Sequence, residues 1–304
     1  MAIATAVLGA NTLYAKNETI RLVYPQWQGG DITSLVKEVP NPDDAAKGYY
    51  LGAQLLNFLA PNNGQKTFVV PISTDITERK ATDGVLDRDL IVRQTKAALD
   101  ILNIENPGRI VTLGGECSVS VVPFTYLSDK YDGDVAMIWI DAHPDITLPG
   151  DVYSGYHAMA VTACMGYGEK QLMDILPGQI KADRILLVGV RNWERDEIKV
   201  RQKQYGIKNI SSEEVAENSN AIRAWLKSCG ASKVVIHFDM DVLDPAEIIA
   251  AVGTDANGMK MEQVVRIIND IASEKEIVGL TVAEAMPRTA IRIKNMLEQL
   301  PLLK

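Results

Sequence analysis

The chain has 304 residues, a formal net charge of −8 and an apolar content of 47%, values that exclude an intrinsically disordered protein. Its acids and bases are mixed without a basic stripe, which argues against a nucleic-acid-binding protein and suits a site that binds cations. The three cysteines show no pairing pattern, as is typical of a reducing compartment. The apolar residues 1–10 have no basic segment before them and are too short to span a membrane, so we expect a cytoplasmic protein without membrane contact.

Short apolar runs alternate with amphipathic segments over most of the chain. We expect strands at residues 20–24, 67–72, 109–113, 135–140, 184–190, 233–238 and 276–282. We expect helices at residues 42–59, 89–102, 193–205, 221–228, 259–273 and 289–300, and helix starts near residues 118, 157 and 212. Strands that alternate with helices form a parallel sheet covered on both faces. Because no repeat or linker interrupts this pattern, we expect one α/β domain over residues 1–304.

Residue types that bind metals follow two of the expected strands directly. Asp141, His143 and Asp145 follow one strand, and Asp239 and Asp241 follow another. Open α/β sheets bind their ligands at the carboxyl ends of strands, and side chains two residues apart on an extended segment point the same way. One such acidic turn alone would be interpreted as a helix cap in solvent. Two such turns supply enough ligands for two divalent ions, which would neutralise the repelling carboxylates.

The two motifs resemble those of the ureohydrolases, the family of arginase, agmatinase and formimidoylglutamase. The resemblance covers roughly residues 114–287 and rests on Asp-Ala-His-x-Asp at 141–145 and Asp-x-Asp-x-x-Asp-Pro at 239–245. It implies a three-layer α/β/α domain with a mainly parallel sheet of about eight strands. It also implies hydrolysis of a guanidino or formimino carbon–nitrogen bond by a hydroxide that bridges two Mn ions, with release of urea or a urea-like product. A homo-oligomer, trimer or hexamer, is implied as well.

The resemblance assigns roles to the five strand-end residues. Asp141 and Asp239 would each bridge the two metal ions. Asp145 would bind one ion only, and His143 and Asp241 would bind the other. Asp145 is also a candidate to relay a proton during the reaction.

Two further residues match catalytic positions of the family. His157, which follows the pair Ser154-Gly155, would supply a proton to the departing amine, a role that suits an imidazole near its ordinary pKa. Glu284 would orient the planar guanidinium-type group through charge-assisted hydrogen bonds. Without the resemblance, Glu284 is an ordinary acid at the end of a strand.

The main departure from the family lies at Cys117, where the resemblance predicts a metal-binding histidine. A thiolate can bind a divalent ion, and it suits Zn or Fe better than Mn. We therefore expect two divalent ions, Mn first, with Zn, Fe, Co or Ni as alternatives. A second interpretation makes Cys117 a small buried apolar residue in a catalytically idle, regulatory family member. A third makes it an oxidisable thiolate in a redox-sensitive hydrolase.

His237 lies two residues before Asp239 and should share its face of the strand. Two roles fit this position. A buried imidazole more often forms hydrogen bonds, so we expect a hydrogen-bond partner behind the ligands. The alternative is that His237 binds metal directly in place of the missing histidine.

The sequence indicates the class of reaction more closely than it indicates the substrate. Ser154 is retained from the arginase pattern, whereas Thr147 replaces an asparagine that is typical of arginases. Glu194 and Glu197 are candidates to bind a substrate amino group, with an ordinary helix start as the alternative interpretation. Arginine, N-hydroxyarginine, a guanidino acid and formiminoglutamate all remain candidate substrates.

Overall fold

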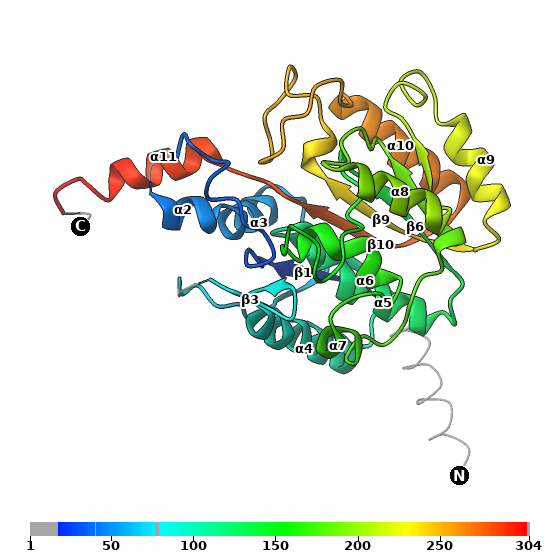
Figure 1. Ribbon diagram of the computed structural model, residues 1–304, viewed down its shortest axis with the longest axis horizontal. Helices are drawn as coiled ribbons and strands as arrows, with labels where there is room; N and C mark the ends of the chain where they lie inside the picture. The colour runs from blue at the N-terminus through cyan, green and yellow to red at the C-terminus, as the bar shows by residue number, and fades with distance from the viewer. Residues whose placement is uncertain (1–17, 40, 77–78, 303–304) are drawn as a thin grey trace, which may run out of the picture.

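The computed structural model describes residues 18–39, 41–76 and 79–302 of the chain (Figure 1). The prediction made for residues 1–10 lies outside this part. Among the described helices, none is long and apolar enough to cross a membrane.

Eight strands form one sheet in which every pairing is parallel. The strands are β1 (Thr19–Tyr24), β2 (Lys66–Val69), β5 (Arg109–Gly114), β6 (Val135–Ile140), β7 (Ile185–Val188), β8 (Lys208–Ile210), β9 (Lys233–Asp239) and β10 (Glu276–Ala283). Their order across the sheet is β2-β1-β5-β10-β9-β6-β7-β8. The predicted parallel sheet of about eight strands is therefore confirmed.

Strand β6 shows why the apolar runs form the centre of this sheet. All six of its residues are buried, and neighbouring strands pair with it on both sides. Successive side chains point to opposite faces, so Met137 and Trp139 pack in one core, and Ile138 and Ile140 pack in another. A strand buried on both faces needs a continuous apolar run, which is what the sequence contains.

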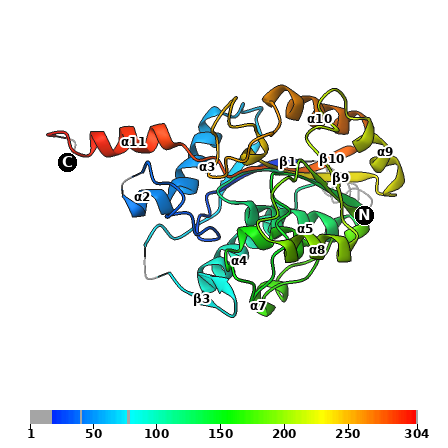
Figure 2. The ribbon, with the colours of Figure 1, turned by 45° about the horizontal axis from the view of Figure 1, so that its top comes forward.

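Helices cover both faces of the sheet. They are α2 (Pro42–Ala46), α3 (Gly48–Leu59), α4 (Arg88–Glu105), α5 (Val121–Lys130), α6 (Ala160–Cys164), α7 (Lys170–Met173), α8 (Asp196–Tyr205), α9 (Asn220–Ser228), α10 (Met261–Glu274) and α11 (Arg288–Leu297). Figure 2 shows α9 and α10 on one side of the strands and α4, α5 and α8 on the other. This is the predicted three-layer α/β/α arrangement.

Two of the predicted helices differ from the structure. The helix expected at 42–59 is divided into α2 and α3 at Lys47, whose backbone dihedral angles leave the helical region. The next residue, Gly48, packs against Met286. The helix expected from residue 212 is a turn. Ser211 and Glu214 do form the reciprocal hydrogen bonds of a capping box. However, the Arg266 guanidinium donates to the backbone carbonyl groups of Val215 and Ala216, which a further helical turn would use. The short elements β8, α7 and the hairpin of β3 (Ala81–Thr82) and β4 (Val85–Leu86) were not predicted.

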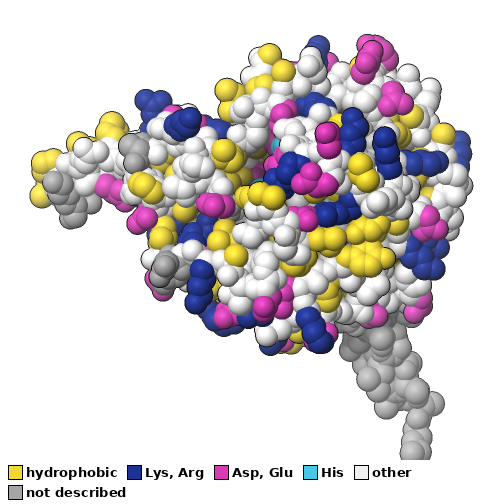
Figure 3. Space-filling model, in the orientation of Figure 1, with side chains coloured by type: hydrophobic (Ala, Val, Ile, Leu, Met, Phe, Trp, Pro, Cys, Tyr) yellow, Lys and Arg dark blue, Asp and Glu magenta, His cyan; other side chains and the backbone are white. Residues whose placement is uncertain are grey.

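The C-terminal helix α11 projects away from the sheet (Figure 1). Ile293, Met296 and Leu297 on this helix are exposed, and Figure 3 shows apolar side chains gathered along the arm. Over the rest of the face in Figure 3, acidic and basic side chains are interspersed, as the sequence predicts.

Gly52 in α3 is in close contact with the segment that follows β10. A Cβ atom at position 52 would lie 1.7 Å from the backbone oxygen of Ala285, next to Glu284. Alanine normally favours a helix over glycine by about 1 kcal/mol, but a 1.7 Å overlap with backbone lies at the upper end, about 2–3 kcal/mol, of what overpacking costs. We expect Gly52→Ala to lower the free energy of unfolding in urea by about 1–2 kcal/mol. Gln54→Ala in the same helix is the control, with a change within about 0.5 kcal/mol; equal stability of both variants would contradict the contact.

Candidate functional site

Four neighbouring strands of the sheet end at one place. Strands β5, β10, β9 and β6 are adjacent, and their carboxyl ends lead into Cys117, Glu284, Asp239 and Asp141 respectively. Parallel pairing aligns these ends at one edge of the sheet. Residues separated by up to 167 positions in the chain therefore come into contact, as in the 3.1 Å hydrogen bond from the Cys117 backbone N–H to Glu284 Oε1.

A cavity of about 430 Å³ opens beside these strand ends. Nine residues expected in the site line it: Cys117, His143, Asp145, Thr147, His157, Glu194, Asp239, Asp241 and Glu284. Asp141 is fully buried behind them. Ser154 and Glu197 do not line the cavity.

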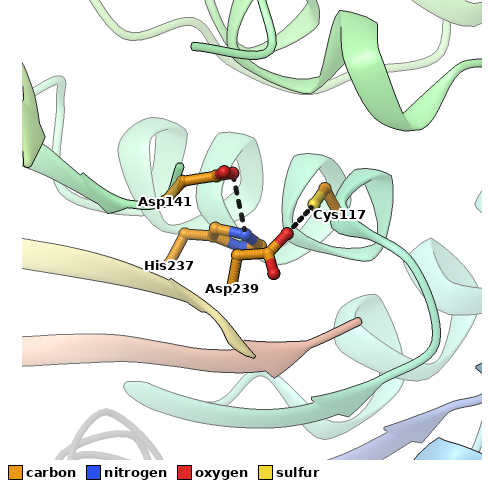
Figure 4. Close-up of side chains that lie close together, drawn as sticks. All are labelled: Cys117, Asp141, His237 and Asp239. Atoms are coloured by element: carbon orange, nitrogen blue, oxygen red, sulfur yellow. Dashed lines mark hydrogen bonds and ion pairs between the residues drawn. The ribbon is translucent and has the colours of Figure 1, made fainter. Parts of the chain in front are cut away.

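Among the described residues, potential metal ligands form three groups. One consists of Cys117, His157 and Glu284, and the other two share Asp141. The first ligand group consists of Cys117, Asp141, His237 and Asp239, whose ligand atoms all lie within 4.8 Å of one another (Figure 4). The second ligand group consists of Asp141, His143 and Asp241, within the same limit. One oxygen of Asp141 faces each group, because Oδ2 is 4.0 Å from His237 Nε2 and Oδ1 is 3.7 Å from His143 Nδ1. Asp141 could therefore supply a ligand oxygen to either group.

The first ligand group concentrates negative charge in a buried place. Cys117 Sγ lies 2.9 Å from Asp239 Oδ2. Burial, followed by the surrounding carboxylates, raises the pKa of both side chains well above their ordinary values. The same two causes raise the pKa of Asp141 to about 7. A bound cation would offset this repulsion, so the donor set fits a metal ion.

The second ligand group is organised around the His143 ring. Nδ1 lies 2.9 Å from Asp241 Oδ2, and Nε2 lies 3.4 Å from Asp255 Oδ2. Burial opposes a charge on His143, but Asp241 and its other acidic neighbours raise its pKa well above the ordinary value. Burial likewise opposes ionisation of Asp241, but His143 lowers the Asp241 pKa to about 2. Asp255 was not predicted, because it lies in a loop with no motif around it.

Asp145 occupies a different position from the other expected ligands. Its backbone adopts a left-handed conformation with φ of 48°, so the chain is not extended there. Asp145 belongs to none of the three ligand groups, although it is buried and lines the cavity. Its Oδ2 atom has no hydrogen-bond partner among the described residues. A buried carboxylate oxygen of this kind can still bind a cation or hold a proton.

His157 and Glu284 meet at the mouth of the first ligand group. His157 Nδ1 is 3.3 Å from Glu284 Oε1, and Nε2 is 2.7 Å from the hydroxyl oxygen of Tyr153. Burial opposes a charge on His157, but Tyr153 and Glu284 raise its pKa well above the ordinary value. Tyr153 was not predicted, although its place directly before Ser154 in the loop was a usable signal. The ring of His157 is thus held between a hydroxyl group and a carboxylate.

The four residues expected to bind the substrate differ in whether their side chains reach the cavity. The Thr147 hydroxyl donates to the Ala158 carbonyl at 2.8 Å, so it supports the loop. Ser154 accepts a hydrogen bond from the Leu86 N–H through its carbonyl oxygen. Glu194 lines the cavity, whereas Glu197 is exposed beside Arg195. Of these four, only Glu194 has a side-chain acid available to the cavity.

Comparisons with known proteins agree with this geometry. The family model described as "Arginase family" matches residues 68–297. An arginase from Staphylococcus aureus is 33% identical over 156 residues, which cover 48% of this chain and 49% of that protein. The match therefore spans about half the length of such relatives. The crystal structure of an Entamoeba histolytica arginase in complex with L-ornithine has a TM-score of 0.74 and 17% identity, and the match covers 90% of this chain and 92% of that one.

Proposed function

The chain belongs to the arginase family, and we propose that it is a metal-dependent hydrolase of a guanidino or formimino carbon–nitrogen bond. The observation that carries the proposal is the pair of ligand groups that share Asp141, next to the contact between His157 and Glu284. The products would be an amine and urea or a urea-like molecule. The cavity beside these residues has a volume of about 430 Å³, within the usual range of small-molecule sites.

The residues at the strand ends fit two divalent ions. We assign the ligands as Cys117, Asp141, Asp145 and Asp239 for one ion, and Asp141, His143, Asp239 and Asp241 for the other. When bound, two such ions lower the pKa of a water towards neutrality and so supply a nucleophile. The family resemblance favours Mn, and Cys117 extends the range to Zn, Fe, Co and Ni.

The remaining residues would bind the substrate and transfer protons between the attacking water and the departing nitrogen. The Glu284 carboxylate would accept hydrogen bonds from a planar guanidinium-type group. Hydrolysis adds water to the central carbon and breaks one carbon–nitrogen bond, so the departing nitrogen must gain a proton. His157 would donate it from Nδ1, which faces Glu284, while the Tyr153 hydroxyl holds Nε2. Asp145 would relay the proton that the attacking water loses.

Substrate choice depends on the rest of the cavity. Glu194 and Asp255 would bind a positively charged substrate end, while Ile32 and Leu35 supply an apolar wall. This composition suits arginine, N-hydroxyarginine or another guanidino compound with an amino group better than formiminoglutamate, which carries two carboxylates.

Two wider properties belong to the proposal. We propose that residues 1–304 act as one cytoplasmic domain. We also propose a homo-oligomer, trimer or hexamer, which the exposed apolar side chains of Ile293 and Met296 on α11 support.

A panel of substrates tests the proposal. The metal-stripped protein is loaded with Mn²⁺, Zn²⁺, Co²⁺ or Ni²⁺ and assayed with arginine, N-hydroxyarginine, other guanidino compounds and formiminoglutamate. Release of urea, hydroxyurea or formamide is measured. We expect turnover with at least one pairing of metal and substrate. Absence of turnover in every pairing, with two ions bound per chain, would overturn the proposal.

Cys117 motivates a second candidate function, a catalytically idle regulatory subunit. In that case one ion or none binds per chain, and no substrate is turned over. Measuring bound metal by mass spectrometry in the same preparations separates the two functions. Under the leading proposal, two ions bind per chain.

A further inference from the structure

The imidazole of His237 is fully buried and held on two sides. His237 lies opposite Trp139 in the parallel register of β9 and β6, and the two rings stack with centroids 3.6 Å apart and planes 11° apart. On the ring edge, Nδ1 lies 2.8 Å from Ser120 Oγ. These contacts fix the ring and leave only Nε2 for a further partner.

Nε2 has no hydrogen-bond partner among the described residues. Its distance to Asp141 Oδ2 is 4.0 Å, which is too long for a hydrogen bond. The indole of Trp139 donates to that same Asp141 oxygen at 2.8 Å and so holds it in place. A buried polar atom without a partner is rare in proteins, and an ion or a water is the common explanation.

The position of Nε2 fits an ion. A ring nitrogen of His237 lies within 4.8 Å of the ligand atoms of Cys117, Asp141 and Asp239, and Nε2 is the ring nitrogen that faces Asp141 (Figure 4). Bond lengths in tetrahedral zinc sites place neighbouring ligand atoms about 3.3–3.8 Å apart. The measured separations of 2.9 Å between Cys117 Sγ and Asp239 Oδ2 and 4.0 Å between Nε2 and Asp141 Oδ2 bracket this range. One ion at the centre would reach all four atoms after small side-chain shifts.

We propose that His237 is itself a ligand and supplies, from β9, the imidazole that the first metal site lacks at Cys117. The site would bind a borderline-soft divalent ion such as Zn²⁺ or Co²⁺ through a thiolate, an imidazole and two carboxylates. This inference deepens the proposed function and rests on it for a metal centre at these strand ends. In this ligand set His237 takes the place that the proposed function assigns to Asp145. Asp145 lies outside the first ligand group and would then only relay a proton.

Ligation by His237 fixes its tautomer and changes the metal preference. Nδ1–H would donate to Ser120 Oγ, so that the lone pair of Nε2 points at the ion, as is usual for metal-binding histidines. The Cys117 thiol would lose its proton to solvent when the sulfur–metal bond forms. Nitrogen and sulfur ligands together favour Zn²⁺ or Co²⁺ over Mn²⁺ at this site.

A Co²⁺ titration of the metal-stripped chain, residues 1–304, tests the inference. We expect wild type to bind two Co²⁺ per chain, with a near-ultraviolet sulfur-to-cobalt absorption band that Cys117→Ser abolishes. His237→Asn keeps a polar atom near Ser120 but has none at the position of Nε2. We expect this variant to lower the affinity for one of the two Co²⁺ ions by at least about 100-fold. That is more than the loss of a residue behind a ligand usually costs. The matched control Ser120→Ala removes only the Nδ1 partner and should weaken that ion's binding by about 10- to 100-fold, less than His237→Asn.

A measurement on the wild-type protein covers the case in which His237→Asn does not fold. In a zinc-loaded crystal, the anomalous peak should lie about 2.0–2.1 Å from Nε2 and about 2.3 Å from Cys117 Sγ. A peak without contact to Nε2, no bound metal, or unchanged Co²⁺ binding by His237→Asn would each overturn the inference. Hydrolysis is assayed separately on the same preparations. A wild type that binds metal through Cys117 and His237 but hydrolyses no substrate overturns only the proposed function.

Discussion

Replacing Asp141 with asparagine is expected to abolish hydrolysis and to weaken metal binding in both ligand groups. The residue is fully buried, and its two oxygens face different groups, at 4.0 Å from His237 Nε2 and 3.7 Å from His143 Nδ1. An amide would remove one negative charge from both sites and replace one ligand oxygen with an N–H donor, which cannot bind a cation. We expect a loss of activity greater than about 100-fold, beyond the usual effect of residues behind a ligand.

Metal content and hydrolysis are measured together for Asp141→Asn. Asp244→Asn is the matched control, because Asp244 belongs to the same strand-end motif as Asp239 but is in neither group that shares Asp141 and accepts hydrogen bonds from backbone amides, among them those of Ala246 and Gly258. The control should retain two ions per chain. If Asp141→Asn also retained two ions and activity within about 10-fold of wild type, Asp141 would not be the bridging ligand.

The second large effect is expected at His157. His157→Asn should lower kcat by about 100- to 10,000-fold, the usual contribution of a positioned proton donor. Metal content should not change, because His157 belongs to neither of the two ligand groups that share Asp141. The measurement is kcat at saturating metal, with bound metal determined on the same sample.

Tyr153→Phe provides the comparison for His157. It keeps the imidazole and its 3.3 Å contact with Glu284 but removes the hydroxyl that lies 2.7 Å from Nε2. We expect a smaller loss of kcat than for His157→Asn, because the proton donor remains and only its orientation is relaxed. A kcat of His157→Asn equal to that of wild type would exclude His157 as the proton donor.

Sequence patterns predicted the fold well where burial is complete and the segment is long. Strand β6 was predicted with its exact bounds, because all six residues are buried and apolar. Prediction failed where a distant contact decides the local structure. The turn after Ser211 carries a real helix-start signal, but Arg266 from α10 binds the Val215 and Ala216 carbonyls and stops the helix. Strand β8 has only three residues, too few for a periodic pattern.

By itself, the sequence determined the strand-end motifs and therefore the chemistry of the site. Two acidic turns after apolar strands predict cation binding, because covalent spacing sets which side chains share a face. Only the tertiary structure decided which strands are neighbours and where each ligand atom lies. The sheet order brings Cys117 beside Asp239, and the register of β9 against β6 stacks His237 on Trp139 and leaves Nε2 without a partner. Such pairings join residues far apart in the chain, and the local periodicity of the sequence does not predict them.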